Sequence, residues 1–394
     1  MPRIETLAVH AGRDEFAELG VHAPPIDLST TYPVADLGVG TESFDALVGG
    51  AASAANPIYA RLHNPTVGRV EQALAALEGT EACVAYGSGM AALTAVLMDA
   101  RSRGGHVLVV RPLYGTSDHL LASGLCGLEA EFVDAGDIAA RLRADTALVI
   151  IETPANPTLD LVDVRAVVAA AGAVPVLVDS TFATPVLQRP AALGAAYVLH
   201  SATKFLGGHG DVIAGVVCCS EERARPLRTV RAATGALLHP LGAYLLHRGL
   251  PTLALRVERA QANAIVLANR LAERADVARV HFPGLGTVRN AHLVGTQMAG
   301  PGCLMAIDLR GGYAAAAAVM AKVRLMTPAV SLGSVDTLIQ HPAGLTHRVV
   351  DPEARLASGI GPGLLRLSVG IEAVEDLWAD LAQALDAARL SAAA

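Results

Sequence analysis

The feature that most constrains the fold is an alternation of apolar and helical segments between residues 82 and 219. Six segments of strand length lie here: 82–86, 106–110, 129–133, 146–151, 174–178 and 195–200, and all but 129–133, which contains two glutamates, are largely apolar. Segments with helical periodicity lie between them: 90–100, 117–123, 138–143 and 164–171. Such alternation with short connections predicts an α/β fold, in which helices cover both faces of a mostly parallel sheet. The run 212–219 is expected to add an antiparallel strand.

The alternation has clear limits on either side. Before it, a helix is predicted over 66–78, with Thr66 as N-cap and Gly79 as its stop. After residue 250 the pattern changes to one long helix over 252–274. Further segments then predict a smaller α+β domain: strands at 302–309 and 363–369, and helices at 314–321 and 373–388.

Three units are therefore expected. Residues 1–58 lack sustained periodicity, which predicts an extended arm that lies on another surface, such as a neighbouring subunit. Residues 59–252 form the large domain and residues 253–394 the C-terminal α+β domain.

Composition excludes several classes of function. The net charge of −7 gives the chain no electrostatic reason to bind nucleic acid or an anionic membrane. The longest apolar run, 166–178, contains Gly172 and Pro175 and is too short to span a bilayer. The amino terminus lacks an apolar signal segment, so a cytoplasmic location is expected. The five cysteines have no metal-type spacing, which predicts free thiols and no bound metal.

Polar residues follow the apolar segments where a parallel sheet keeps its ligand site, at the carboxyl ends of the strands. Ser201-Ala202-Thr203-Lys204 follows 195–200 and offers two hydroxyls for an anion and a lysine whose pKa neighbouring apolar residues would lower. Taken alone, however, this tetrapeptide favours an ordinary surface lysine in a polar turn.

Gly87-Ser88-Gly89-Met90 lies between a strand and a helix and is typical of a phosphate site, although many such turns contain glycine. A dinucleotide fingerprint is a weaker interpretation, because position 92 is alanine and no acidic residue follows at the spacing for a ribose.

Asp179 directly follows the strand 174–178. It is either a helix cap or turn residue, or a carboxylate that keeps a heterocyclic nitrogen protonated. An aspartate, a lysine and a phosphate site on strand ends are what pyridoxal phosphate requires.

Tyr114 follows another strand, where it either stacks on a ring and moves a proton or is simply a half-buried aromatic. Arg366 interrupts an apolar strand, either on an exposed face or paired with a buried anion such as an amino-acid carboxylate. Tyr59 and Arg61 are suited to binding a phosphate, although the default interpretation is that both are solvated loop residues.

Eight motifs recur in the same order in the Cys/Met-metabolism pyridoxal-phosphate enzymes, which the chain resembles over nearly its whole length. They are Tyr59-x-Arg61-x-x-Asn64-Pro65-Thr66, Gly87-Ser88-Gly89-Met90, Glu152-Thr153-Pro154-x-Asn156-Pro157, Val178-Asp179-Ser180-Thr181-Phe182, Ser201-Ala202-Thr203-Lys204, Ser331-Leu332-Gly333, the run 341–347, and Leu365-Arg366-Leu367-Ser368-Val369-Gly370.

The resemblance implies the fold type I, aspartate-aminotransferase-like architecture. It also implies a homotetramer of two dimers with shared active sites. Lys204 would hold pyridoxal phosphate covalently, Asp179 would pair with its ring nitrogen, and Tyr114 would stack on the ring. The phosphate would be held by Ser88, Gly89, Met90, Ser201 and Thr203, and from the neighbouring subunit by Tyr59 and Arg61. Arg366, together with Ser331, would bind the substrate carboxylate, and Lys204 and Tyr114 would move protons.

Within the family, the pattern most resembles the methionine γ-lyases. The expected reaction is γ-elimination on a sulfur amino acid, which converts L-methionine to methanethiol, 2-oxobutanoate and ammonia. Val330 stands where related cystathionine enzymes commonly carry glutamate, and an apolar residue suits a thioether. Thr116, Arg231 and Ala232 depart from the methionine γ-lyase pattern. O-acetylhomoserine sulfhydrylase and cystathionine γ-lyase or γ-synthase activities therefore stay open as alternatives.

Overall fold

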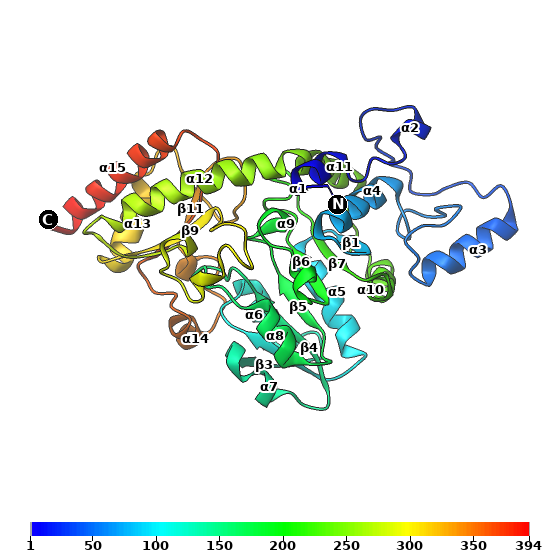
Figure 1. The fold of residues 1–394 in the computed structure, drawn as a ribbon, viewed down its shortest axis with the longest axis horizontal. Helices are drawn as coiled ribbons and strands as arrows, with labels where there is room; N and C mark the ends of the chain where they lie inside the picture. Colours follow the sequence, from blue (N-terminus) through cyan, green and yellow to red (C-terminus); the bar gives the residue numbers. More distant parts are fainter. Residues whose placement is uncertain (1, 394) are drawn as a thin grey trace.

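The structure, a computed structural model, describes residues 2–393, which form two sheets joined by a long helix (Figure 1). The larger sheet has seven strands, in the order β1 (Ala82–Tyr86), β7 (Gly215–Cys219), β6 (Tyr197–His200), β5 (Val176–Asp179), β4 (Thr146–Glu152), β2 (His106–Val110) and β3 (Glu129–Val133). Strand β7 is antiparallel to both of its neighbours, and every other pair is parallel. The mostly parallel sheet and its antiparallel strand are therefore confirmed.

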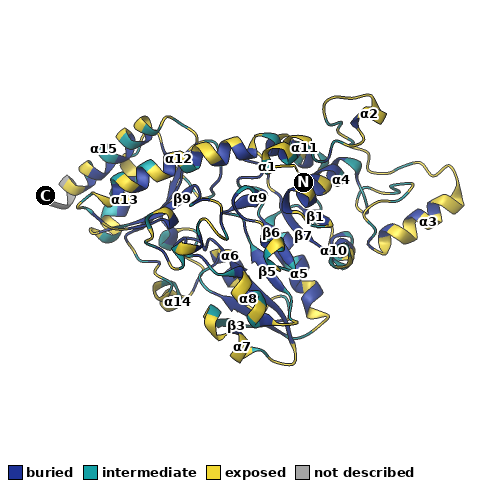
Figure 2. Ribbon diagram, viewed as in Figure 1, coloured by how far each residue is buried: buried dark blue, intermediate teal, exposed yellow. Residues whose placement is uncertain are grey.

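Alternate side chains of these strands pack against opposite layers of helices, because successive residues of a strand point to opposite faces. Val84 and Val217 pack in the core with helices α5 (Gly89–Arg101) and α10 (Glu221–Thr234). Cys83 and Val216 point the other way, toward α4 (Pro65–Glu78) and α11 (Pro240–Gly249). Smaller helices complete the layers: α6 (Gly115–Ala122), α7 (Ile138–Arg141), α8 (Val164–Ala171) and α9 (Thr184–Leu187). Apart from the edge strand β3, which is only partly buried, the strands of this sheet are buried on both faces (Figure 2).

Helix α4 corrects one local prediction. Its N-cap is Asn64, not Thr66: the Asn64 side chain accepts hydrogen bonds from the backbone N–H groups of Thr66 and Val67. Pro65 takes the first helical position, where its missing N–H costs nothing. The predicted stop is confirmed, since Gly79 ends the helix with φ at 73°.

The C-terminal part begins with α12 (Leu253–Ala272) and contains the second sheet. Its strands lie in the order β10 (Thr327–Pro328), β11 (Leu338–Gln340), β12 (Leu364–Ser368), β9 (Leu304–Leu309) and β8 (Val277–His281). Helices α13 (Gly312–Lys322) and α15 (Val374–Ala393) pack against each other, and α14 (Pro352–Ala357) lies in a connection. The sequence predicted β9, β12, α13 and α15 but not β8, β10 or β11.

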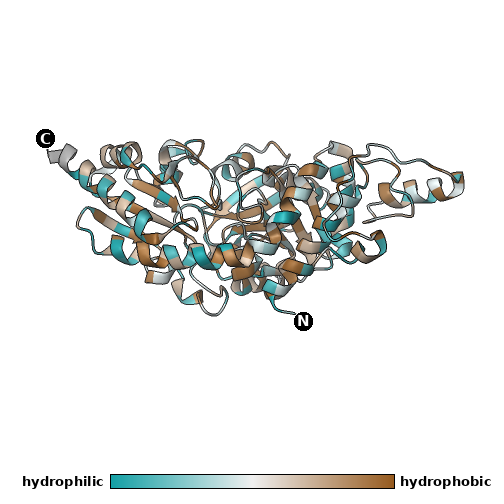
Figure 3. Ribbon diagram, turned by 90° about the horizontal axis from the view of Figure 1, so that it is seen from above, coloured by the Kyte–Doolittle hydropathy of each residue, from teal (hydrophilic) through white to brown (hydrophobic). Residues whose placement is uncertain are grey.

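Residues 1–58 contain helices that the sequence did not predict. These are α1 (Ile4–His10), α2 (Phe16–Leu19) and α3 (Leu37–Val48). Helix α3 stands away from the body of the chain in both views (Figures 1 and 3). It leaves Leu37 and Phe44 82% and 49% exposed. The proposed domain boundaries stay a prediction.

No helix between residues 2 and 393 is both long and apolar enough to cross a membrane. All five cysteines are free thiols.

Candidate active site

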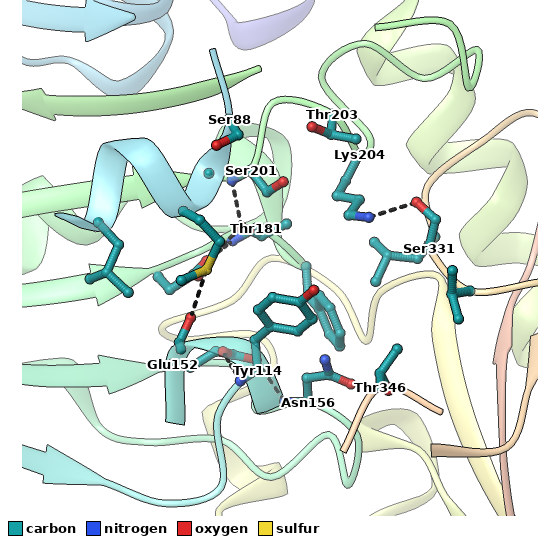
Figure 4. Close-up of a pocket in the computed structure, with 18 of the residues that line it drawn as sticks. Ser88, Tyr114, Glu152, Asn156, Thr181, Ser201, Thr203, Lys204, Ser331 and Thr346 are labelled. Atoms are coloured by element: carbon teal, nitrogen blue, oxygen red, sulfur yellow. Dashed lines mark hydrogen bonds between the residues drawn. The ribbon is translucent and has the colours of Figure 1, made fainter. Parts of the chain in front are cut away.

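A cavity of about 500 Å³ lies between the carboxyl ends of the parallel strands and the C-terminal domain. It brings together ten of the predicted site residues: Ser88, Gly89, Met90, Tyr114, Asp179, Ser201, Thr203, Lys204, Ser331 and Arg366. Ser88, Ser201 and Thr203 lie at one end, Asn156 and Thr346 at the other, and Tyr114 and Lys204 between them (Figure 4). The two ends therefore offer different chemistry on either side of the lysine.

The environment of the Lys204 amine favours its neutral, nucleophilic form. Its Nζ donates a hydrogen bond of 2.6 Å to Oγ of Ser331 (Figure 4). Burial, together with the positive charge of Arg366, lowers the pKa of Lys204 from 10.5 to about 8. Close to neutral pH a useful fraction of this amine is therefore unprotonated and able to attack a carbonyl carbon.

This shift predicts how the cofactor-free protein responds to pH. Since only the neutral amine is nucleophilic, Lys204 should react with pyridoxal phosphate slowly below its pKa and faster above it. The rate of uptake, followed by absorbance in stopped flow, should rise with a midpoint near pH 8. A free lysine derivative in the same buffers is the control. A midpoint near 10.5 would contradict the proposed environment of the amine.

Asp179 lines the cavity, and one of its carboxylate oxygens is free of hydrogen bonds from the described residues. Its Oδ1 accepts hydrogen bonds from the backbone N–H and the hydroxyl of Thr181, at 3.0 and 2.5 Å. Among residues 2–393, none donates a hydrogen bond to its Oδ2. Burial raises the pKa of Asp179, while the Thr181 bonds oppose that rise. A partly buried carboxylate with a free oxygen fits a cationic partner, such as a protonated ring nitrogen.

The start of helix α5 lies at one end of the cavity and is suited to an anion. The first N–H groups of a helix lack intrahelical partners and carry partial positive charge. Ser88 caps the helix by accepting from the N–H of Ala91. A Cβ added at Gly89 would lie 3.0 Å from that of Ser201, so glycine allows the two segments this close approach. The hydroxyl of Thr203 is already engaged, because it donates to the carbonyl of Ala214 and accepts from its N–H. Its predicted contact with a phosphate requires the hydroxyl to leave that donor bond.

Arg366 forms the opposite end and is 2% exposed. Its Nη1 donates to Oδ1 of Asn156 at 2.8 Å, and its Nη2 donates to the carbonyl of Ser331 at 2.6 Å. Burial lowers the pKa of Arg366 to about 10, so it stays charged at neutral pH. Ser331 thus contacts both Lys204 and Arg366, and it does so at φ 85°, a strained conformation for serine that is common at functional sites.

The structure adds cavity residues to which the sequence assigned no role: Glu152, Asn156, Thr181, Phe182 and Thr346. Glu152 ends strand β4 just as Asp179 ends β5, and the two are register partners. The rule that located Asp179 also applies to Glu152. Asn156, Thr181, Phe182 and Thr346 also lie within the motifs shared with the family, but their residue types alone did not point to a role.

Tyr59 and Arg61 lie outside the cavity of their own chain. Arg61 donates to the carbonyl of Ala232 at 2.7 Å, and its guanidinium lies 5.6 Å from the centre of the Tyr59 ring. Tyr59 is 45% exposed. Their predicted cofactor role therefore depends on a second chain.

The cavity thus combines a nucleophilic lysine, a carboxylate and a helix start, all at strand ends. Residues 5–386 match the sequence pattern of the family described as Cys/Met metabolism PLP-dependent enzymes. This chain belongs to that family. As a Cys/Met metabolism enzyme it uses pyridoxal phosphate, which confirms the predicted cofactor. The lysine, the carboxylate and the helix start fit that group, while the role of each residue stays a prediction.

Relatives in the family agree with this assignment. The L-methionine gamma-lyase of Streptomyces avermitilis is 56% identical over 389 residues, which span 98% of this chain and 90% of that protein. The L-methionine gamma-lyase of Brevibacterium sandarakinum is 54% identical, with 98% of each chain covered. The crystal structure of cystathionine gamma synthase from Xanthomonas oryzae pv. oryzae superposes with a TM-score of 0.91 at 37% identity, over 99% of this chain and 100% of that one. These similarities confirm the predicted α/β fold of the PLP-dependent fold type I enzymes.

Proposed function

We propose that this protein is a pyridoxal-phosphate lyase that acts on L-methionine. With one water, each methionine yields methanethiol, 2-oxobutanoate and ammonia. The observation that carries the proposal is the apolar wall of the cavity. The side chains of Ile213, Val330 and Leu345 make up this wall. The acidic residues that line the cavity, Glu152 and Asp179, lie elsewhere, at the ends of the strands. Such a wall suits a methylthio group better than the charged amino-acid end of cystathionine. The names and identities of the relatives also support this choice.

In this proposal each end of the cavity has its own task. Pyridoxal phosphate, when bound, supplies an electron sink for negative charge that develops on substrate carbon. Arg366 binds the α-carboxylate and fixes the substrate relative to Lys204. Lys204 Nζ removes the proton from the α-carbon and returns it further along the substrate. The Tyr114 hydroxyl gives a proton to the departing sulfur, and Asp179 stays ionised against the ring nitrogen.

A panel of amino acids tests the function directly. The loaded enzyme is supplied with methionine, homocysteine, cystathionine or O-acetylhomoserine, and 2-oxo acid and volatile thiol are measured. Methionine should give equal amounts of 2-oxobutanoate and methanethiol. A parallel assay of O-acetylhomoserine with sulfide detects the alternative sulfhydrylase, and release of cystathionine and acetate from O-acetylhomoserine with cysteine detects the γ-synthase. Absence of 2-oxo acid from every sulfur amino acid would refute the lyase.

We also propose a homotetramer of two dimers in which Tyr59 and Arg61 complete the partner's cavity. Their exposure and their position outside their own cavity support this arrangement, as do the exposed apolar side chains of α3. The cytoplasmic location expected from the sequence stays a prediction.

Mixing two inactive variants should reveal the shared site. Lys204→Ala and Arg61→Ala homomers, unfolded and refolded together at equal amounts, form hybrids in which one cavity has Lys204 and the partner's intact Arg61. About a quarter of the wild-type activity should return, because half of the random dimers carry one complete cavity of two. Each homomer refolded alone is the control. Failure of the mixture to exceed the mean of the two homomers would show that Arg61 serves its own chain.

A further inference from the structure

A second carboxylate lies in the cavity beside Asp179. Glu152 is the last residue of β4, is 5% exposed, and is the register partner of Asp179 on β5. Burial and the neighbouring Asp179 raise the pKa of Glu152 well above its usual value. A side chain this costly to bury needs compensating contacts.

Those contacts join two separate parts of the cavity. Oε2 of Glu152 accepts a hydrogen bond of 2.7 Å from the backbone N–H of Tyr114, at the start of α6. Oε1 accepts one of 2.8 Å from the backbone N–H of Asn156. Both oxygens are therefore occupied by N–H donors, one of which belongs to the residue whose ring stands in the middle of the cavity (Figure 4).

Asn156 carries the connection onward to Arg366. Its backbone is held by Glu152, and its side-chain oxygen accepts from Nη1 of Arg366 at 2.8 Å. None of the ion pairs within residues 2–393 includes Arg366. Its acceptors are all neutral: the Asn156 amide, the Ser331 carbonyl and, in the amide orientation that satisfies its neighbours, the Gln340 side chain. Glu152 raises the pKa of Arg366 through space and so opposes the effect of burial.

This arrangement leaves Arg366 charged but without a carboxylate of its own. A carboxylate bound directly to Arg366 would compete with the carboxylate of an incoming substrate. Glu152, which is separated from Arg366 by Asn156, stabilises the positive charge and leaves the guanidinium free to pair.

We propose that Glu152 is a positioning residue that fixes the Tyr114 backbone and, through Asn156, the Arg366 guanidinium. Glu152 thereby couples Tyr114, which would face the cofactor ring, to Arg366, which would bind the substrate carboxylate. The inference rests on the proposed function in taking Arg366 as the carboxylate site.

A double-mutant cycle on carboxylate binding tests the coupling. Glu152→Gln keeps the shape of the side chain but replaces one acceptor oxygen by an NH₂ group, which cannot accept from a backbone N–H. Asn156→Ala cuts the link to Arg366. Butanoate binding to the cofactor-loaded protein, measured by calorimetry, should weaken about 10-fold in either single variant. Glu152→Gln should add less than about 2-fold in the Asn156→Ala background, because the residues act in series. Glu375→Gln, on an exposed glutamate far along the chain, is the matched control and should not change the affinity.

The outcomes separate cleanly. Unchanged butanoate affinity in Glu152→Gln, or fully multiplicative effects in the double variant, would overturn the proposal. If Glu152→Gln fails to fold or to hold the cofactor absorption band, Asn156→Ala alone decides, since it leaves Glu152 in place and must still weaken butanoate about 10-fold. Butanoate binding needs no turnover, so the test stands even if methionine is not the substrate. With the true substrate, both single variants should raise KM more than they lower kcat.

Discussion

Replacement of Lys204 by alanine is expected to lower kcat for methionine by on the order of 10⁴-fold, because in the proposed mechanism one amine both anchors the cofactor and moves the α-proton. The fold should survive. The amine makes one polar contact, to the hydroxyl of Ser331, and that hydroxyl also lines the cavity and can turn to solvent. Turnover is measured by release of 2-oxobutanoate, and folding by thermal unfolding of the cofactor-free protein.

Lys322 supplies a matched control. The chain contains two lysines, and Lys322 lies exposed at the end of α13, which contributes no residue to the cavity. Lys322→Ala should keep wild-type turnover. Borohydride reduction of the loaded protein should fix pyridoxyl on the peptide that contains Lys204, as read by mass spectrometry. Pyridoxyl on Lys322, or residual activity above about a tenth in Lys204→Ala, would refute the assignment.

The second large effect is expected from Asp179→Asn, with kcat lowered about 10³-fold, since the variant loses the charge proposed to keep the ring nitrogen of the cofactor protonated. The substitution is well matched to the structure. Both Thr181 bonds go to Oδ1, so asparagine can keep them and place its NH₂ group at the position of Oδ2. Local geometry should therefore stay the same while the charge disappears.

Stability separates this effect from damage to the fold. Burial raises the pKa of Asp179, which means that its ionised form costs stability at neutral pH. Removal of the charge should leave the Tm of the cofactor-free protein equal or higher, and the absorption maximum of the bound cofactor should shift. Asp137→Asn, at an exposed position, is the control and should change neither property. A markedly lower Tm, or turnover close to wild type, would contradict the proposed role.

The large sheet and one wall of the cavity were predictable because they follow from local pattern. Apolar segments gave the strands, and the rule that ligands lie at carboxyl ends pointed to Asp179 and Lys204. The same rule applies to Glu152, but a carboxylate that accepts from the Tyr114 and Asn156 backbones leaves no mark on the sequence by itself.

Contacts between the two domains could not be predicted from local pattern. The bond from Lys204 to Ser331 spans 127 residues, and the one from Arg366 to Asn156 spans 210. Both depend on how the second sheet packs against the first. Helix α3 was missed for a different reason. Gly38 and Gly40 weaken its helical signal, and several of its apolar side chains remain exposed instead of marking a buried face.

The scarcity of lysine also makes the protein a convenient object for conjugation. Apart from the amino terminus, an amine-directed dye, polymer or resin meets one exposed attachment point, Lys322, while the other lysine, Lys204, lies inside the cavity, where it is proposed to hold the cofactor. With the amino terminus blocked, enzyme tethered through Lys322 should therefore be uniformly oriented by its C-terminal part, with the mouth of the cavity unmodified.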